Sequence, residues 1–168
     1  SEFYEGAGDD WAPSRIAQKF SSDGGLTWSQ TSTLLENEGK QGTMEVDFLR
    51  MPSGDICLFY SRKNSNDDLR VMMRKSKDDG KTWGESRRIS DWHGYVGTTN
   101  DRSILTSKGR IILPFWYSVN DAFMEPWYSV CQVFYSDDEG DTWGISMPAL
   151  SAPYSSGGST EPAVVELS

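Results

Sequence analysis

Short runs of alternating apolar and polar residues recur along the chain, and residues that favour turns follow each run. Between residues 44 and 90, MEVDFLRM alternates in this way and PSGD follows it as a turn. ICLFYSRK, LRVMMRKS and SRRIS then continue as further runs. A period of two places alternate side chains on opposite faces of a β-strand. The pattern therefore predicts four short antiparallel strands in this stretch.

The same order of runs appears again in the next stretch. RSILTS, a KG turn, RIILPFWYSV and WYSVCQVFYS follow one another. Near the N-terminal end, SRIAQKF reads as the third strand of a unit that lacks its first two strands. PAVVELS reads as the first strand of a further unit. We therefore expect a single domain divided into units at 1–43 (incomplete), 44–98, 99–156 and 157–168.

One octapeptide pattern, S-x-D-x-G-x-T-W, follows the third run of each of the first three units, as SSDGGLTW, SKDDGKTW and SDDEGDTW. The aspartate can accept hydrogen bonds from backbone N–H groups, and the glycine allows a positive φ. The tryptophan adds an apolar ring to the core. We interpret the pattern as a structural hairpin loop, with Asp79 as a solvated neighbour. The predicted structural residues are Asp23, Trp28, Asp78, Trp83, Asp138 and Trp143.

An EF-hand calcium loop is excluded for these octapeptides. Such a loop needs a glutamate at its twelfth position. Counted from the repeated aspartates, the twelfth residues are Leu34, Ile89 and Ala149, and none of them can ligate a metal through its side chain. Four short strands per unit at this period are typical of a β-propeller blade. A β-sandwich is the alternative, but it does not explain one motif at one place in every unit.

The charge and the rare residue types narrow the possible partners. The net charge of −9 argues against nucleic acid or an anionic membrane as a general partner. The sequence has no apolar run of about 18 residues, so we expect no membrane span.

Cys57 and Cys131 lie in apolar runs and are predicted to be buried free thiols. The single histidine, His93, is predicted to lie in a solvated loop, and no metal site or cofactor is predicted.

The three octapeptides resemble Asp-boxes, also called BNR repeats, of the sialidase (neuraminidase) superfamily. RMPSGDICLFYSRK, NDRSILTSKGRIILP and GGSTEPAVVEL resemble the openings of its second, third and fourth blades. The resemblance implies an all-β fold, a partial sialidase-type β-propeller of about three four-stranded antiparallel blades, where the full family fold has six. It also suggests an extracellular or periplasmic protein, although no signal peptide is visible.

Sialidases use a tyrosine nucleophile paired with a glutamate, an aspartate as general acid/base, and three arginines that clamp the sialic acid carboxylate. By resemblance, Glu161 matches the glutamate, and Asp10 or its neighbour Asp9 matches the acid. The alternatives are a strand-capping glutamate and an ordinary acidic loop. The residues expected to line the substrate site are Glu45, Asp47, Asn100, Asp101 and Arg102. The alternative for Asp101 and Arg102 is a tight-turn ion pair.

Glu45 and Asp47 lie two positions apart in one predicted strand. They should therefore point into the site together or not at all. The tyrosine and the arginine clamp have no match in this sequence. We therefore expect a sialidase-like glycoside hydrolase, or a fragment of one, that acts on terminal sugars of glycans and is inactive alone.

The alternative function is a non-catalytic carbohydrate-binding or structural propeller module. Trp11, Trp92, Trp116 and Trp127 are its candidate sugar platforms, unless they pack between blades. In each case the expected ligand is a glycan or a small carbohydrate. Exposed blade faces and strand edges favour association, so two copies could close a six-bladed ring as a homodimer.

Overall fold

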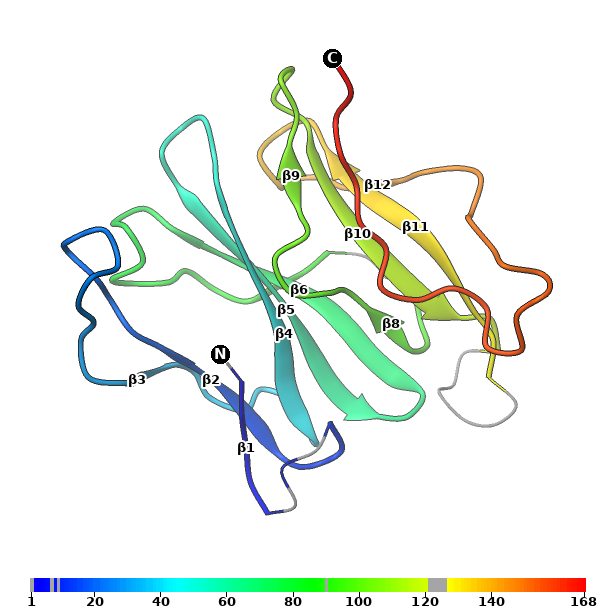
Figure 1. Cartoon of the computed structure of the whole chain (residues 1–168), viewed down its shortest axis with the longest axis horizontal. Helices are drawn as coiled ribbons and strands as arrows, with labels where there is room; N and C mark the ends of the chain where they lie inside the picture. The colour runs from blue at the N-terminus through cyan, green and yellow to red at the C-terminus, as the bar shows by residue number, and fades with distance from the viewer. Residues whose placement is uncertain (1, 7, 9, 90, 121–126) are drawn as a thin grey trace.

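The computed structural model describes residues 2–6, 8, 10–89, 91–120 and 127–168. In these residues the chain forms strands and no helix, so the fold is all-β (Figure 1). The strands of the first half are β1 (Glu2–Tyr4), β2 (Ser14–Gln18), β3 (Ser32–Leu35), β4 (Gly42–Arg50), β5 (Ile56–Ser65) and β6 (Asp68–Ser76). Those of the second half are β7 (Arg87–Arg88), β8 (Val96–Gly97), β9 (Ile104–Leu105), β10 (Ile111–Ser118), β11 (Ser129–Ser136) and β12 (Gly144–Ile145).

The strands form two sheets. The larger sheet has the order β1-β2-β4-β5-β6-β7, with β3 also paired to β2. The smaller sheet has the order β12-β11-β10-β8, with β9 also paired to β10. Neighbouring strands are antiparallel except β2 and β4, which are joined in parallel at Ser14 and Gly42. Figure 1 shows β1–β3 on one side of β4–β6, and β8–β12 on the other.

Strand β5 is buried on both faces, which explains its unbroken apolar run ICLFY. Cys57 and Phe59 face a core cluster shared with β10 and β11. Leu58 and Tyr60 face a second cluster shared with β2 and β3. Alternate residues of one strand therefore hold the layers on both sides of it together. The other buried members of the first cluster are Met51, Val71, Met73, Ile89, Val96, Ile111, Leu113, Phe115 and Phe134.

Most of the predicted strands are present. The four runs between residues 44 and 90 form β4, β5, β6 and β7, although β7 has only two residues. The first run of the next unit, RSILTS, forms β9, and a further short strand that was not predicted, β8, lies before this run and also pairs with β10. Both cysteines are free and buried, as predicted.

The two ends of the chain differ from the prediction. A strand precedes SRIAQKF, since β1 pairs with β2 in the register Glu2↔Ile16. PAVVELS was predicted to be a strand but forms none in the structure. Instead, the Glu166 carboxylate accepts hydrogen bonds from the backbone N and Oγ of Ser107, at 2.7 and 2.8 Å.

The three octapeptide loops, at 21–28, 76–83 and 136–143, share one hydrogen-bond pattern. In the second loop, Thr82 donates its N–H to Asp78 at 2.9 Å and its hydroxyl at 2.6 Å. Ser76 Oγ also donates to Asp78 and accepts from the N–H of Gly80, whose φ is 80°. The same bonds occur around Asp23 and Asp138. The predicted hydrogen bonding is therefore confirmed.

These donors lower the pKa of the repeated aspartates. Hydrogen bonds from the threonine are the largest cause, and they hold the pKa of Asp23, Asp78 and Asp138 at about 2. The neighbour Asp79 is exposed, as predicted, but it also forms an ion pair with Arg50 at 2.9 Å. The loops are therefore closed by their own hydrogen bonds and leave no carboxylate free for other chemistry.

Candidate functional site

A pocket of about 230 Å³ lies where segments from both ends of the chain meet β4, β5 and β10. It brings together three of the predicted site residues, Asp10, Glu45 and Glu161. We call it the carboxylate pocket. The other lining residues are Trp11, Met44, Lys63, Tyr95, Thr99, Trp116, Trp127 and Thr160.

The Glu45 carboxyl is held by donors from two distant segments. Ser61 Oγ and the backbone N–H of Thr98 both donate to its Oε2. Its own backbone N–H donates to the Glu2 carboxylate. Burial outweighs these hydrogen bonds and raises the pKa of Glu45 to about 7. At neutral pH this carboxyl can therefore both donate and accept a proton.

Lys63 is the cation of the pocket and is almost completely buried, with 1% of its surface exposed. Its Nζ lies 3.6 Å from the centroid of the Trp11 ring. The same Nζ donates to the backbone carbonyl of Asp10 at 2.9 Å. A desolvated cation–π contact contributes about 2 kcal/mol. Lys63 therefore ties the segment that carries Asp10 to β5.

Tyr4 connects the N-terminal strand to the same segment. Its hydroxyl donates to Glu2 at 2.6 Å and to Asp10 at 3.2 Å. Burial and the two carboxylates raise the pKa of Tyr4 well above its usual range. Tyr95 lines the pocket, and burial together with the nearby Glu45 raises its pKa as well. Both phenols are therefore held in the protonated form.

Glu161 lies near the C-terminal end of the sequence, and Arg102 holds it by hydrogen bonds. The guanidinium of Arg102 donates to the backbone carbonyl of Glu161 and, at 3.4 Å, to its carboxylate. Glu161 also has a positive φ of 53°, which is uncommon for a residue with a side chain. Arg102 contacts Glu161 and is absent from the lining of the carboxylate pocket.

The prediction that Glu45 and Asp47 point the same way is wrong. The register of β4 against β5 shifts between Met44 and Asp47, and Glu45 has a φ of 61°. A bulge of this kind breaks the alternation of side chains. Glu45 consequently lines the pocket, whereas buried Asp47 accepts hydrogen bonds from the backbone N–H groups of Arg102 and Ser103.

The remaining predicted residues lie around the pocket or away from it. Asn100 accepts a hydrogen bond from the Val46 N–H at 2.7 Å and, with Asp101, lines a neighbouring hollow. Asp9 lies outside the described residues. Trp92 packs on Tyr117, with ring centroids 4.4 Å apart, and does not line the pocket.

Several residues that line the pocket were not predicted from the sequence, namely Met44, Lys63, Tyr95, Thr99 and Thr160, and neither was Glu2, which accepts a hydrogen bond from the Glu45 N–H. Lys63 ends the run ICLFYSRK and lies at alternate positions with buried Phe59 and Ser61. Alternate residues of a strand share one face, so this spacing could have predicted that Lys63 is buried. Glu2 gave no such signal. His93 is exposed in a loop, as predicted, 3.4 Å from Arg70.

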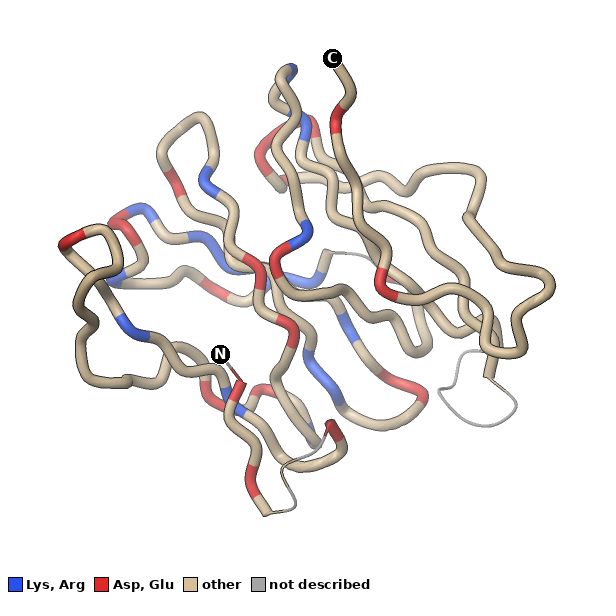
Figure 2. Tube along the Cα trace, viewed as in Figure 1, with Lys and Arg blue, Asp and Glu red and all other residues tan. Residues whose placement is uncertain are grey.

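The described residues contain no cluster of three or more His, Cys, Asp or Glu side chains that could hold a metal ion. In the same part of the chain no helix has the length and apolar character to cross a membrane. Figure 2 shows Lys and Arg spread among acidic residues along the trace, with no single basic region.

The chain is similar in sequence to known bacterial sialidases. It is 28% identical to the sialidase of Paraclostridium sordellii over 169 residues, which cover 83% of this chain and 40% of the relative. It is 27% identical to the sialidase of Clostridium perfringens, over 80% of this chain and 41% of that relative. The chain therefore spans about two fifths of the length of these curated relatives.

Solved structures show a similar fold. Trypanosoma rangeli sialidase matches with a TM-score of 0.70 and 17% identity, over 95% of this chain and 29% of that one. A Dyadobacter fermentans protein of unknown function matches with a TM-score of 0.63 and 16% identity, over 79% of this chain and 43% of that one. A family profile described as a BNR repeat-like domain matches residues 3–168. The chain therefore belongs to the BNR repeat family of the sialidase superfamily.

Proposed function

We propose that the carboxylate pocket is part of the sugar site of a sialidase-type glycoside hydrolase. The observation that carries the proposal is that Asp10 and Glu161, from opposite ends of the chain, line one pocket together with aromatic rings. The sialidase relatives support the same reading. The site would hold a terminal sugar of a glycan, with polar groups on its hydroxyls and rings against its apolar face.

In this proposal Asp10 is the general acid/base that protonates the leaving oxygen. Glu161 is the glutamate that draws a proton from a tyrosine nucleophile. Tyr4 and Tyr95 do not suit that role, since their surroundings raise the pKa of each phenol and disfavour the phenolate. The chain therefore supplies the acid and the partner glutamate but neither the nucleophile nor the arginine clamp, and the isolated chain binds sugar without turning it over.

We also propose that the layers of the fold are blades of a partial propeller. The unit 44–98 supplies β4–β7, and the unit 99–156 supplies β9–β12, with β8 pairing into the second sheet. The incomplete unit 1–43 supplies β1–β3, whereas residues 157–168 contain no strand. Closure of a ring by two copies stays a prediction, and a sedimentation mass of 18.8 kDa would contradict it.

A second candidate function is carbohydrate binding without catalysis. Trp11, Trp116 and Trp127 all line the pocket, and such rings stack on sugar faces. Trp116 reaches this position because its partner in the sheet is Gly97, where a Cβ would lie 2.8 Å from the ring. This function needs the aromatic rings but not the carboxylates.

Titration with the sialidase inhibitor DANA, which is bound in one of the matching Trypanosoma rangeli structures, tests the proposal. We expect saturable binding followed by tryptophan fluorescence, and an affinity at least about tenfold lower for Glu161→Gln. Glu166→Gln is the matched control, because Glu166 contacts Ser107 outside the pocket. Binding that is unchanged in Glu161→Gln but lost in Trp116→Ala would favour the non-catalytic alternative. Hydrolysis of a fluorogenic sialoside by the Glu161→Gln chain would contradict the assigned role of Glu161.

A further inference from the structure

Three acidic residues in or beside the carboxylate pocket share an unusual backbone conformation. The φ angles of Glu45, Asp101 and Glu161 are 61°, 53° and 53°. Residues with side chains seldom adopt a positive φ, and they keep it only where the surrounding structure holds the backbone in place. The groups that hold these three residues are therefore part of how the pocket is built.

The bulge in β4 and the segment before β9 hold each other through bonds between side chains and backbone. The Val46 N–H, which follows the bulged residue, donates to Asn100 Oδ1 at 2.7 Å. In the opposite direction, Asp47 Oδ2 accepts from the N–H groups of Arg102 and Ser103, at 3.1 and 2.7 Å. Each segment therefore fixes the backbone directly after the positive-φ residue of the other.

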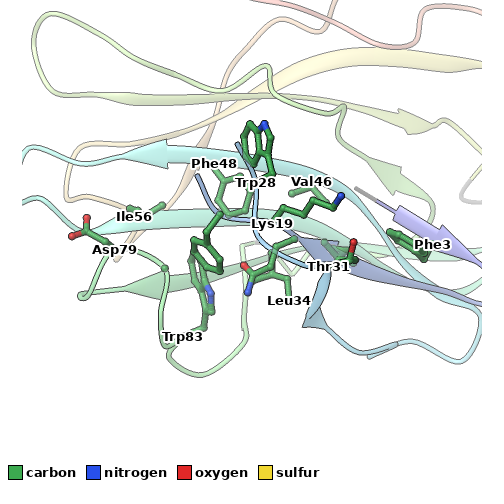
Figure 3. Close-up of a pocket in the computed structure, with 15 residues that line it drawn as sticks. Phe3, Lys19, Trp28, Thr31, Leu34, Val46, Phe48, Ile56, Asp79 and Trp83 are labelled. Carbon is green, nitrogen blue, oxygen red and sulfur yellow. The ribbon is translucent and has the colours of Figure 1, made fainter. Parts of the chain in front are cut away.

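Asp47 lies on the face of β4 that is turned toward the smaller sheet. Figure 3 shows its neighbours Val46 and Phe48, which line an apolar hollow of about 500 Å³ along β2. Asp47 pairs with Phe59 across β4 and β5, so it lies on the face opposite to Phe48, where the core is shared with β10 and β11. Only 1% of its surface is exposed. Its carboxylate is therefore enclosed and cannot serve as a sugar ligand.

Arg102 connects Asp47 to Glu161. The backbone of Arg102 is bonded to Asp47, and its guanidinium donates to the backbone carbonyl of Glu161 and, at 3.4 Å, to the Glu161 carboxylate. A side chain keeps a fixed position only where its own backbone is held by supporting hydrogen bonds. The position of Glu161 consequently depends on Asp47, although Asp47 does not line the carboxylate pocket.

We propose that Asp47 is a positioning residue, which holds Glu161 in the carboxylate pocket by fixing the backbone from which Arg102 reaches it. The inference rests on the proposed function only for the part of Glu161 in sugar binding. A binding site needs its groups held within about 0.5 Å of the productive geometry. Removal of the Asp47 carboxylate takes the acceptor from two backbone N–H groups and releases the Arg102 side chain from its fixed starting point.

Backbone order parameters of the free full chain, measured by NMR relaxation, test the proposal without a ligand. In Asp47→Ala, the order parameter at Glu161 is expected to fall from about 0.85 to below about 0.6. Arg102→Ala should have the same effect, whereas Asp47→Asn keeps an accepting oxygen and should keep the wild-type value. Glu38→Ala is the matched control, because it also removes a largely buried carboxylate, which is paired with Arg74 outside the pocket.

The affinity for DANA then shows whether Asp47 acts through Arg102. Asp47→Ala is expected to lower the affinity about tenfold, and Asp47→Asn should recover most of it. The double variant Asp47→Ala/Arg102→Ala should bind no more weakly than Arg102→Ala alone. Residues that act through one another give such non-additive effects, whereas independent losses add. Glu38→Ala should leave the affinity unchanged.

An unchanged order parameter at Glu161 in Asp47→Ala, or losses of affinity that add in the double variant, would overturn the inference. Equal losses in Asp47→Asn and Asp47→Ala would also overturn it. If the alanine chain does not fold, Asp47→Ser takes its place in both measurements. A wild-type chain that does not bind DANA would contradict the proposed function, and the order parameters would then decide the role of Asp47 on their own.

Discussion

The octapeptide loops and the carboxylate pocket use the same kind of side chain in opposite ways. In the loops, Asp23 and Asp138 are exposed and Asp78 is half-buried, and each carboxylate receives donors from within four residues. In the pocket, Glu45 receives donors from Ser61 and Thr98, which lie far away in the sequence. The pKa of the loop aspartates falls to about 2, and that of Glu45 rises to about 7.

This difference separates the carboxylates that serve the fold from those available for chemistry. A loop that satisfies its own aspartate repeats unchanged wherever the local sequence repeats. A pocket assembled from distant segments has no repeating pattern, and within it Glu45 is held largely away from water. A carboxyl group whose pKa is shifted by its surroundings in a pocket, as that of Glu45 is, is typical of functional sites. Four substitutions test this distinction.

Glu45→Gln is expected to have the largest effect, and it depends on pH. The folded pKa of about 7 lies above the unfolded value of about 4.3. The folded state therefore binds the extra proton, and stability falls as the pH rises from about 4 to 7. The substitution should stabilise the chain by up to about 3 kcal/mol at pH 8 and have little effect at pH 4. Denaturant unfolding at the two pH values measures this, and an equal effect at both would contradict it.

Lys63→Met should come second, because it removes the cation that holds Trp11 and the Asp10 carbonyl. We expect a loss of about 1–3 kcal/mol of stability, together with faster hydrogen exchange in the segment around Asp10. Lys63→Arg keeps the positive charge and should recover part of both. Unchanged exchange around Asp10 in the methionine variant would show that Lys63 does not hold that segment.

Arg102→Ala should affect binding more than stability. Its contact with the Glu161 carboxylate is partly exposed, so the free energy of unfolding should change by no more than about 1 kcal/mol. The affinity for DANA should nevertheless fall about tenfold, because Glu161 is no longer held in place. Arg50→Ala is the matched control, since its ion pair with Asp79 lies at an octapeptide loop. Equal losses of affinity in the two variants would remove the distinction between loop and pocket.

A single octapeptide substitution should have the smallest effect, and its pH dependence has the opposite sign. The folded pKa of Asp78, about 2, lies below the unfolded value of about 3.9. Its contribution is present above about pH 4 and is lost as the pH falls towards 2. Asp78→Asn should therefore lower the melting temperature at pH 7 but not at pH 2, while Asp79→Asn should show less of this difference. A melting temperature that falls equally at both pH values would contradict the proposed contribution of the Asp78 carboxylate to stability.

Much of the fold could be predicted from the sequence because its signals are local. Alternating runs and the repeated octapeptide located β4–β6, β10 and β11. The bulge at Glu45 could not be foreseen, since it depends on the fit of β4 to β5 and reverses the side on which Asp47 lies. Lys63 was missed because lysine is seldom buried, and its partners Asp10 and Trp11 lie in a segment far from it in the sequence. Asp10 and Glu161 came from family resemblance, and their meeting in one pocket depends on long-range packing.

The most direct test is a hydrogen-exchange footprint of DANA on the full chain. We predict protection at residues 95–99 and 159–161 and around Asp10, with none in the octapeptide loops. The double variant Asp10→Asn/Glu161→Gln should lose this protection, whereas Asp78→Asn/Asp138→Asn should keep it. Protection that centres on the octapeptide loops, or that survives in the pocket variant, would contradict the proposal that the carboxylate pocket is the sugar site.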